Sequence, residues 1–215
     1  MQSQSLKYPN RWPTNGGCDF AADPSLSADR ACVVWLPHID PTTVVVGPAP
    51  DEFIEARSIS EVTLSLSRLT ANGQHWLLDR GRDALPIALI GGGMDTARRV
   101  AFVIPLDDSF PVRAEAAGCL FNALTGRTPG RTPNALTAQQ RRRLGLVLRG
   151  LDGLLEHCSY RQIAKVLFGP NSIPAGRGWK THELRGRTIR LCSRGRELMH
   201  GAYLNLLRHP REFRI

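Results

Sequence analysis

The hydrophobic positions change their spacing along the chain, from every second residue to every third or fourth. Up to residue 106 they form short β-branched runs separated by turn residues, which is typical of strands. The runs are ACVVWLP (31–37), TTVVVGP (42–48), EVTLSLSRL (61–69), HWLLDRG (75–81), ALPIALIG (84–91) and RRVAFVIPL (98–106). Because the links are of hairpin length, we predict a mainly antiparallel domain, folded as a small curled sheet or a partly closed barrel.

One pair of runs carries the clearest hairpin signal. Apolar and polar residues alternate from Val62 to Arg68, and the following ANGQ contains an Asn-Gly turn. The chain before the runs, residues 1–30, is rich in Pro, Asn, Gly and Asp without a period, which predicts an irregular arm. We interpret GGGMDT (91–96) as a turn, because it lacks the Lys-Ser/Thr of a phosphate loop.

Helical spacing first appears in DDSFPVRAEAAGCLFNALTG and predicts a helix over residues 108–125. Asp108 or Ser109 suits the cap, and Pro111 suits the first turn. The positions expected to face the core are Val112, Ala116, Cys119, Leu120 and Leu124. RTPGRTPNALT then supplies two prolines and a glycine, which indicates a linker at 127–136.

From Thr137 onward the pattern is wholly helical. We therefore predict an α+β fold, in which a β-rich antiparallel domain (1–126) precedes an all-α domain (137–215). Capping-box patterns open the first two helices, at Thr137 and at Ser159. The inward positions expected are Leu144, Val147, Leu148, Leu151, Leu154 and Leu155 in the first helix, and Ile163, Val166 and Leu167 in the second.

The third helix is expected to begin near Thr181, with Thr181 as its cap and Trp179 as a hydrophobic staple. A kink is predicted near Gly195, since glycine lowers helical propensity. The inner stripe expected is Leu184, Thr188, Leu191, Leu198, Met199 and Ala202. A capped helix, a Gly/Pro-rich turn and a longer basic helix together predict a helix-turn-helix.

Charge is divided unevenly between the two predicted domains. Residues 1–126 hold 10 Lys and Arg against 14 Asp and Glu, and residues 127–215 hold 18 against 5. In the second stretch arginine outnumbers lysine sixteen to two. Such an imbalance favours a polyanionic partner, most often nucleic acid, although solvated surface charge is the alternative.

Twelve residues are candidates for contacts to DNA. An arginine offers paired donors that match phosphate oxygens and the O6/N7 edge of guanine. The first turns of a recognition helix lie nearest the base edges, and residues just before it suit phosphate binding. The candidates are Arg141, Arg142, Arg143, Tyr160, Arg161, Arg177, Lys180, His182, Arg185, Arg187, Arg190 and Arg194.

Catalytic, metal and membrane chemistry find little support in the sequence. The five cysteines and six histidines lack zinc-site spacing, so we expect reduced thiols, no metal and no cofactor. No G-x-S-x-G occurs, and Asp107-Asp108 is better explained as a cap than as a catalytic pair, so we expect no enzyme. Without a signal-peptide core or an apolar run of bilayer length, we expect a cytoplasmic protein with no membrane partner.

Three C-terminal segments resemble a known family. LTAQQRRRLGLVLRGLDGLL, SYRQIAKVLFG and WKTHELRGRTIRLCSRGRELMHGAYLNLL, over about residues 135–208, resemble a proteobacterial domain of unknown function (DUF2285). That domain occurs in regulator-like proteins of conjugative elements and in a hexameric activator of type VI secretion genes. ADPSLSADRACVVWLPHIDP and FPVRAEAAGCLFNALTG are similar to these regulators in their order. The resemblance implies an oligomeric bacterial regulator with a helical DNA-binding domain and no catalytic motif.

Two functions stay open on the sequence alone. The helix-turn-helix pattern and the C-terminal charge favour a transcription regulator whose partner is double-stranded DNA, assembled as a homo-oligomer. Apolar helix stripes allow instead an antiactivator or adaptor that binds a partner regulator, as some short relatives in the family do, with the arginines merely solvated. We expect DNA binding.

Overall fold

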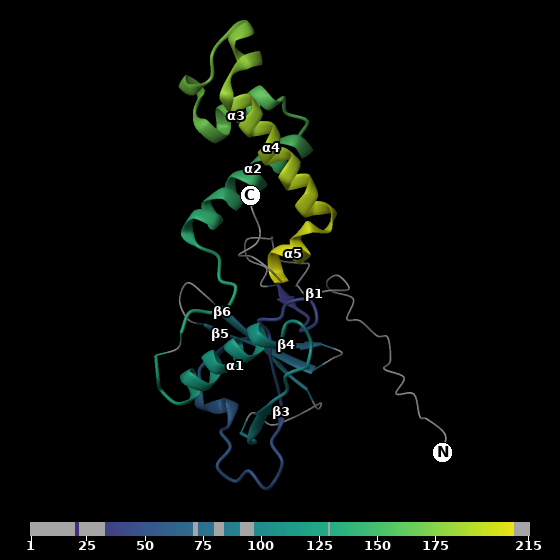
Figure 1. The fold of residues 1–215 in the computed structure, drawn as a ribbon, viewed down its shortest axis with the longest axis vertical. Helices are drawn as coiled ribbons and strands as arrows, with labels where there is room; N and C mark the ends of the chain where they lie inside the picture. The colour runs from purple at the N-terminus through teal and green to yellow at the C-terminus, as the bar shows by residue number, and fades with distance from the viewer. Residues whose placement is uncertain are drawn as a thin grey trace, which may run out of the picture. The chain divides into compact units, whose positions relative to one another are not determined.

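The computed structural model describes residues 20–21, 33–70, 73–79, 84–90, 97–128 and 130–208. Two compact units make up the chain, Met1–Pro133 and Asn134–Ile215, and Figure 1 shows the elements of each. The division falls inside the stretch predicted as a linker. Most of the predicted arm and the GGGMDT turn lie outside the described residues.

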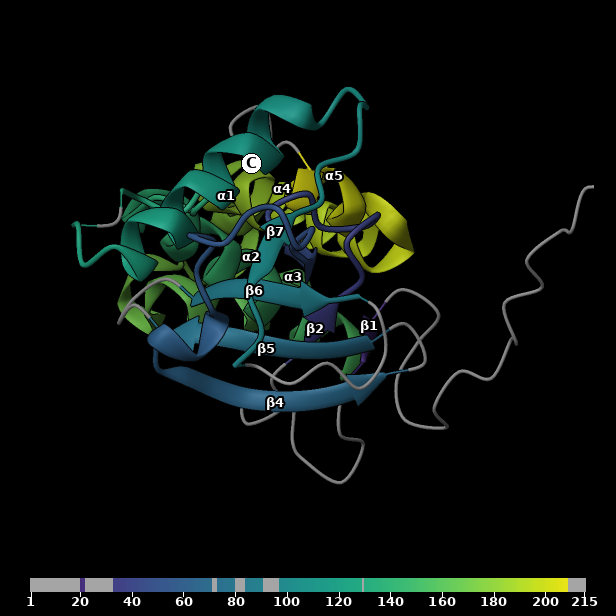
Figure 2. The ribbon, with the colours of Figure 1, turned by 90° about the horizontal axis from the view of Figure 1, so that it is seen from below.

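The first unit is built on a mixed β-sheet. Its five strands run in the order β4-β5-β6-β3-β7, and a separate pair joins β1 to β2. The strands are β1 (Phe20–Ala21), β2 (Val34–Trp35), β3 (Val44–Pro48), β4 (Leu64–Thr70), β5 (Gly73–Asp79), β6 (Ala84–Leu89) and β7 (Val100–Phe102). The predicted β4–β5 hairpin is confirmed, and Figure 2 shows β4, β5 and β6 side by side.

Two details of the sheet differ from the expectation. Strand β3 pairs in parallel with β6, although the other pairings in the described sheet are antiparallel. The sheet is therefore mixed. Strand β6 lies between β5 of the hairpin and β3, and not at an edge of the sheet. In addition, Phe20–Ala21 pairs with Val34–Trp35, so part of the predicted irregular arm is a short strand.

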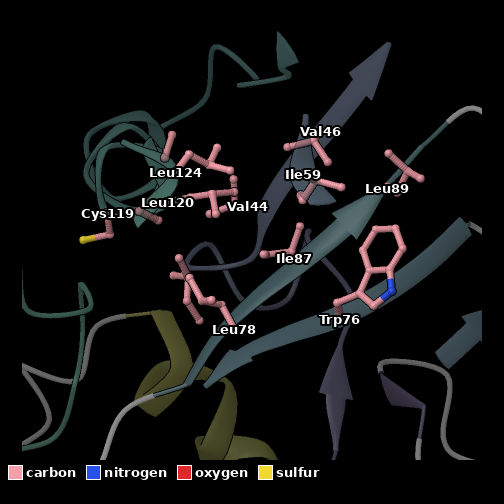
Figure 3. Packing of buried hydrophobic residues seen from close by; sticks show 13 residues of the cluster. Val44, Val46, Ile59, Trp76, Leu78, Ile87, Leu89, Cys119, Leu120 and Leu124 are labelled. Atoms are coloured by element: carbon pink, nitrogen blue, oxygen red, sulfur yellow. The ribbon is translucent and has the colours of Figure 1, made fainter. Parts of the chain in front are cut away.

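One helix packs on the sheet and completes the α+β architecture. Helix α1 (Phe110–Leu124) follows β7, the last strand. The short 3-10 turn η1 (Ile59–Glu61) lies earlier, between β3 and β4. Its Leu120 and Leu124 lie beside Val44 of β3 in the core (Figure 3). Ser109 is the N-cap, but its side chain makes no capping hydrogen bond. The cap is supported by Asp107, whose carboxylate accepts from the Ser109 N–H at 3.0 Å.

The second unit is a set of packed helices. Its elements are α2 (Ala138–Leu155), α3 (Tyr160–Phe168), η2 (Pro170–Ser172), η3 (Gly176–Thr181), α4 (Glu183–Glu197), the π-helical turn η4 (Leu198–Ala202) and α5 (Tyr203–Arg208). Both predicted capping boxes form, from Thr137 to Gln140 and from Ser159 to Gln162. Gly169, with a φ of +92°, ends α3, which is a backbone conformation that glycine adopts without a steric cost.

The third helix begins later than predicted. Its N-cap is His182, whose Nδ1 accepts a hydrogen bond from the Leu184 N–H at 3.3 Å. Thr181 belongs to the preceding turn, so its assignment as the cap was wrong. Trp179 does not directly precede the cap, as a staple must. Its ring stacks on the His182 ring with centroids 6.2 Å apart.

The predicted kink near Gly195 was also wrong. The helix continues through Gly195 and breaks at His200 and Gly201, where Gly201 has a φ of +109°. A side chain at position 195 would clash with α2, because a Cβ there would lie 2.8 Å from the Leu151 Cβ. Tertiary packing decides the role of this glycine, and helical propensity does not.

Some helix positions predicted to face inward are exposed, namely Leu148, Leu155, Val166 and Met199, with Val166 the most exposed at 77%. The buried stripe of α2 is narrower than its leucine pattern, with Leu144, Val147 and Leu151 covered. Cys192 of α4 is buried, as expected for most of the cysteines, although it was not part of the inner stripe predicted for this helix. The reason is that α4 approaches α2 over glycines, so that few large side chains are needed between them.

Candidate nucleic-acid interface

A basic groove, which we call the arginine groove, lies between α2 and α4. It has a volume of about 730 Å³. Its lining consists of Gln139, Arg142, Arg143 and Leu146 from α2, with Arg187, Arg190, Leu191 and Arg194 from α4. Five arginines and no acidic residue thus converge on one concavity, with two leucines among its walls.

Close helix packing shapes this groove. A Cβ at Gly150 of α2 would meet the Cys192 Sγ at 3.3 Å, and one at Gly195 would meet Leu151. The Cys192 thiol donates to the Gly150 carbonyl at 3.4 Å, and burial raises its pKa, which favours the neutral thiol. Because the two backbones approach so closely, arginines on the rims of both helices reach the same space.

The three arginines of α4 are held in different ways. The Arg187 guanidinium lies over the Phe168 ring, 4.9 Å from the centroid, which is a cation–π contact. Arg194 pairs with Glu197 one turn further on. The Arg190 side chain reaches back one turn toward the N-terminus of α4, to Gly186. Its Nη1 would lie 3.4 Å from a Cβ added to that glycine.

The remaining basic candidates lie outside the groove. Arg141 is exposed on α2, and Arg177 and Lys180 are exposed on η3. Arg185 is exposed on α4, but at about 100° per residue it stands roughly half a turn from Arg187, Arg190 and Arg194. The structure therefore unites five of the twelve candidates and places these four elsewhere.

Two further candidates make contacts within the protein, and a third is half-buried. Arg161 donates from Nη2 to the Pro174 carbonyl at 2.7 Å, which ties α3 to the turn that follows it. His182 caps α4 and stacks on Trp179. Tyr160 is the first residue of α3 and is half-buried. The groove residues that sequence reasoning missed are Gln139, Leu146 and Leu191, since nothing in their spacing distinguishes them from an ordinary helix face.

The described part of the chain holds no group of three His, Cys, Asp or Glu residues that could bind a metal ion. Among the described helices, none combines the length and apolar character needed to cross a bilayer.

Basic side chains clustered on one face are typical of a domain that binds nucleic acid. Residues 103–208 match the model of a family described as T6SS, transcription factor, DNA-binding domain, where T6SS denotes the type VI secretion system. The match indicates a DNA-binding domain that acts in transcription regulation. It spans α1 of the first unit as well as α2–α5.

This family agrees with the type VI secretion part of the resemblance drawn from the sequence. The resemblance to DUF2285 stays a prediction. No curated protein and no solved structure matches the chain.

Proposed function

We propose that this chain is a bacterial transcription regulator that binds double-stranded DNA in the cytoplasm through the arginine groove. The observation that carries this proposal is the convergence of Arg142 and Arg143 from α2 with Arg187, Arg190 and Arg194 from α4 on one surface. Guanidinium groups bind phosphate oxygens with paired hydrogen bonds, and their charge does not titrate in the physiological range. The family match supports a role in controlling secretion genes, and mobile-element genes are the other target that the resemblance implies.

The positions of the helices suit different kinds of contact to DNA, either to the backbone phosphates or in the major groove. In helix-turn-helix proteins the first helix crosses the DNA backbone while the recognition helix enters the major groove. The first helix of the predicted helix-turn-helix is α3, and α4 is its recognition helix. Helix α2, which precedes the motif, carries Arg142 and Arg143 near its start, where they suit phosphates, and α4 carries the other three groove arginines. Arg141, Tyr160, Arg177 and Lys180 are proposed as additional backbone contacts. Arg161, His182 and Arg185 remain candidate contacts that the groove itself does not include.

A salt series with matched variants tests this function. We expect the double variant Arg187→Ala/Arg190→Ala to bind DNA upstream of its own gene at least about tenfold more weakly than the wild type. The slope of log affinity against log salt should also become shallower, by about 0.9 for each phosphate contact that is lost. Electrophoretic mobility shift or fluorescence anisotropy from about 50 to 200 mM salt measures both quantities.

The control is Arg196→Ala, because Arg196 is exposed on α4 and stands roughly half a turn from the groove arginines. It removes one positive charge from the same helix but none from the groove. Affinity that is insensitive to salt, or equal losses per charge in both variants, would overturn the assignment of the groove.

A second candidate function is favoured by a different surface. An apolar pocket of about 300 Å³ between α2 and α3 includes Gly153, Ile163 and the exposed Val166. An exposed apolar surface of this kind is where an antiactivator or adaptor would hold a partner regulator. If Val166→Glu abolished regulation in cells and left DNA affinity unchanged, this second function would be supported. The homo-oligomer implied by the resemblance also remains a prediction, which sedimentation analysis would test.

A further inference from the structure

Arg190 differs from the other groove arginines of α4 in what holds its side chain. Arg187 is stacked on Phe168, and Arg194 is engaged by Glu197. No ion pair within the described part of the chain engages Arg190, and its side chain is exposed. Of the three groove arginines on α4, Arg190 is the one that, within the described residues, is neither stacked on an aromatic ring nor ion-paired. Its guanidinium can therefore turn to form the paired hydrogen bonds that a base edge requires.

Gly186 determines where the Arg190 guanidinium lies. Side chains on a helix lean toward its N-terminus, and Arg190 follows this rule by reaching back one turn. Its Nη1 would lie only 3.4 Å from a Cβ at position 186, which is a tight contact. Because Gly186 has no side chain, the guanidinium lies close to the helix backbone in the first turns of α4. These are the turns that approach the base edges when a recognition helix enters the major groove.

We infer that Arg190 is the base-reading arginine of this helix, and that it recognises guanine through its O6 and N7 atoms in a position set by Gly186. The inference rests on the proposed function. The other four groove arginines serve phosphates, which carry no sequence information. Glycine at 186 has a second effect, since it lets the α4 backbone approach the DNA more closely than a larger residue would.

Replacement by lysine separates the two roles. Lysine keeps the positive charge and so retains the general electrostatic attraction to DNA, but it cannot reproduce the rigid two-donor fork of arginine. We therefore expect Arg190→Lys to lose sequence discrimination while its affinity for unrelated DNA stays within about twofold. At the selected site the affinity should fall about tenfold, which corresponds to a discrimination of about 1.4 kcal/mol for one base.

The experiment uses the full chain and a duplex selected from a random library by the wild-type protein, with a scrambled duplex of equal length as the non-specific probe. Arg196→Lys is the matched control, because Arg196 is exposed on α4 and does not line the groove, and it should bind the two duplexes within about twofold of the wild type. Arg142→Lys and Arg187→Lys should weaken binding to the two duplexes by the same factor, since phosphate contacts carry no sequence information. Repeating the selection with Arg190→Lys should remove the preference for guanine at one position of each bound unit. Gly186→Ala should weaken discrimination in the same direction, since it displaces the guanidinium.

The outcomes distinguish this inference from the function beneath it. Selection of no sequence by the wild type, together with salt-independent binding, would overturn the proposed function and the inference with it. Sequence-specific binding that Arg190→Lys leaves unchanged would overturn the inference alone. Loss of discrimination in Arg187→Lys in place of Arg190→Lys would overturn the assignment of Arg190 and identify the stacked arginine as the reader.

Discussion

The two units of this chain build their interiors in opposite ways. In the sheet unit the described core cluster contains thirteen buried residues, from Trp76 and the strand leucines to Leu120 of α1. The corresponding cluster in the helical unit is formed by Leu144, Val147 and Leu198, and further buried side chains such as Leu151, Ile163 and Cys192 lie outside that cluster. The helical unit brings α2 and α4 together over Gly150 and Gly195, so its cohesion depends on close backbone contact more than on the volume of its side chains.

Charge follows the same division. Residues 1–133 hold 12 Lys and Arg against 14 Asp and Glu, a balance of −2, while residues 134–215 hold 16 against 5, a balance of +11. Mutual repulsion destabilises a compact unit with so much positive charge. The comparison shows that the basic unit combines a small interior with a crowded cationic surface. We therefore expect it to be the more sensitive of the two to changes in packing.

The largest expected effect is at the contact between α2 and α4. Gly195→Val places a side chain where Leu151 and the Val147 carbonyl lie 2.8 and 3.2 Å from the new Cβ, and such overpacking should cost about 3 kcal/mol. Hydrogen exchange read by mass spectrometry, which resolves the two units, should show the loss in the helical unit alone. Gly145→Ala is the control, because no atom lies within 4 Å of its Cβ, and it should stabilise α2 by up to about 1 kcal/mol.

An intermediate effect is expected in the sheet unit, at a buried arginine. Arg113 of α1 is 8% exposed, donates to the Pro37 carbonyl at 2.9 Å and pairs with Asp107 at 3.2 Å. Arg113→Ala should cost about 2 kcal/mol, discounted because Asp107 is half exposed. Arg57→Ala breaks the exposed pair with Glu61, and its cost should stay below about 0.5 kcal/mol in urea unfolding. If the two variants lost the same free energy of unfolding, the burial of Arg113 would contribute nothing to stability.

The smallest expected effect is the pH dependence of the sheet unit. Burial lowers the pKa of His75 below its ordinary value of 6.5. The unfolded chain then takes up a proton below about pH 6.5 that the folded unit does not, so stability present above this pH is lost as the pH falls. We expect the free energy of unfolding, measured by urea midpoints, to fall from pH 7.5 to 5.5 by no more than the linkage of one proton, which is about 1.4 kcal/mol per pH unit.

Two variants and one opposing group complete this pH test. Burial raises the pKa of Asp40, so protonation of this carboxyl works in the other direction and stabilises the folded unit as the pH falls from its folded-state pKa toward 3.8. His75→Gln should therefore flatten the loss near pH 6, whereas Asp40→Asn should leave it in place. An unchanged slope in His75→Gln would rule out His75 as its source.

Local signals in the sequence predicted local structure well. Capping boxes at Thr137 and Ser159 mark the starts of α2 and α3, because each box involves only four consecutive residues. Helix α1 and the β4–β5 hairpin follow from patterns that are also contiguous in the sequence. The α+β class was predictable for the same reason.

Features that depend on distant contacts were not predictable. The parallel pairing of β3 with β6 joins strands about 40 residues apart, and no turn signal specifies it. Gly195 and Gly201 look alike in the sequence, yet one makes a tertiary contact and the other ends a helix in a positive-φ conformation. Spacing did reveal the stripe of Arg187, Arg190 and Arg194, but the groove also needs α2, whose approach to α4 depends on Gly150 and Cys192.

Asn134, at the start of the helical unit, has a consequence for how this unit could be handled. Its Nδ2 donates to the carbonyls of Leu207 and Arg208 at 3.4 and 3.1 Å, which brings the first residue of the unit to the last turn of α5. Two positions that lie this close can serve as the entry and exit points of a segment inserted into a host loop. Residues 134–208 therefore form a cassette that enters and leaves at one point, suited to transplantation into another protein with a short linker.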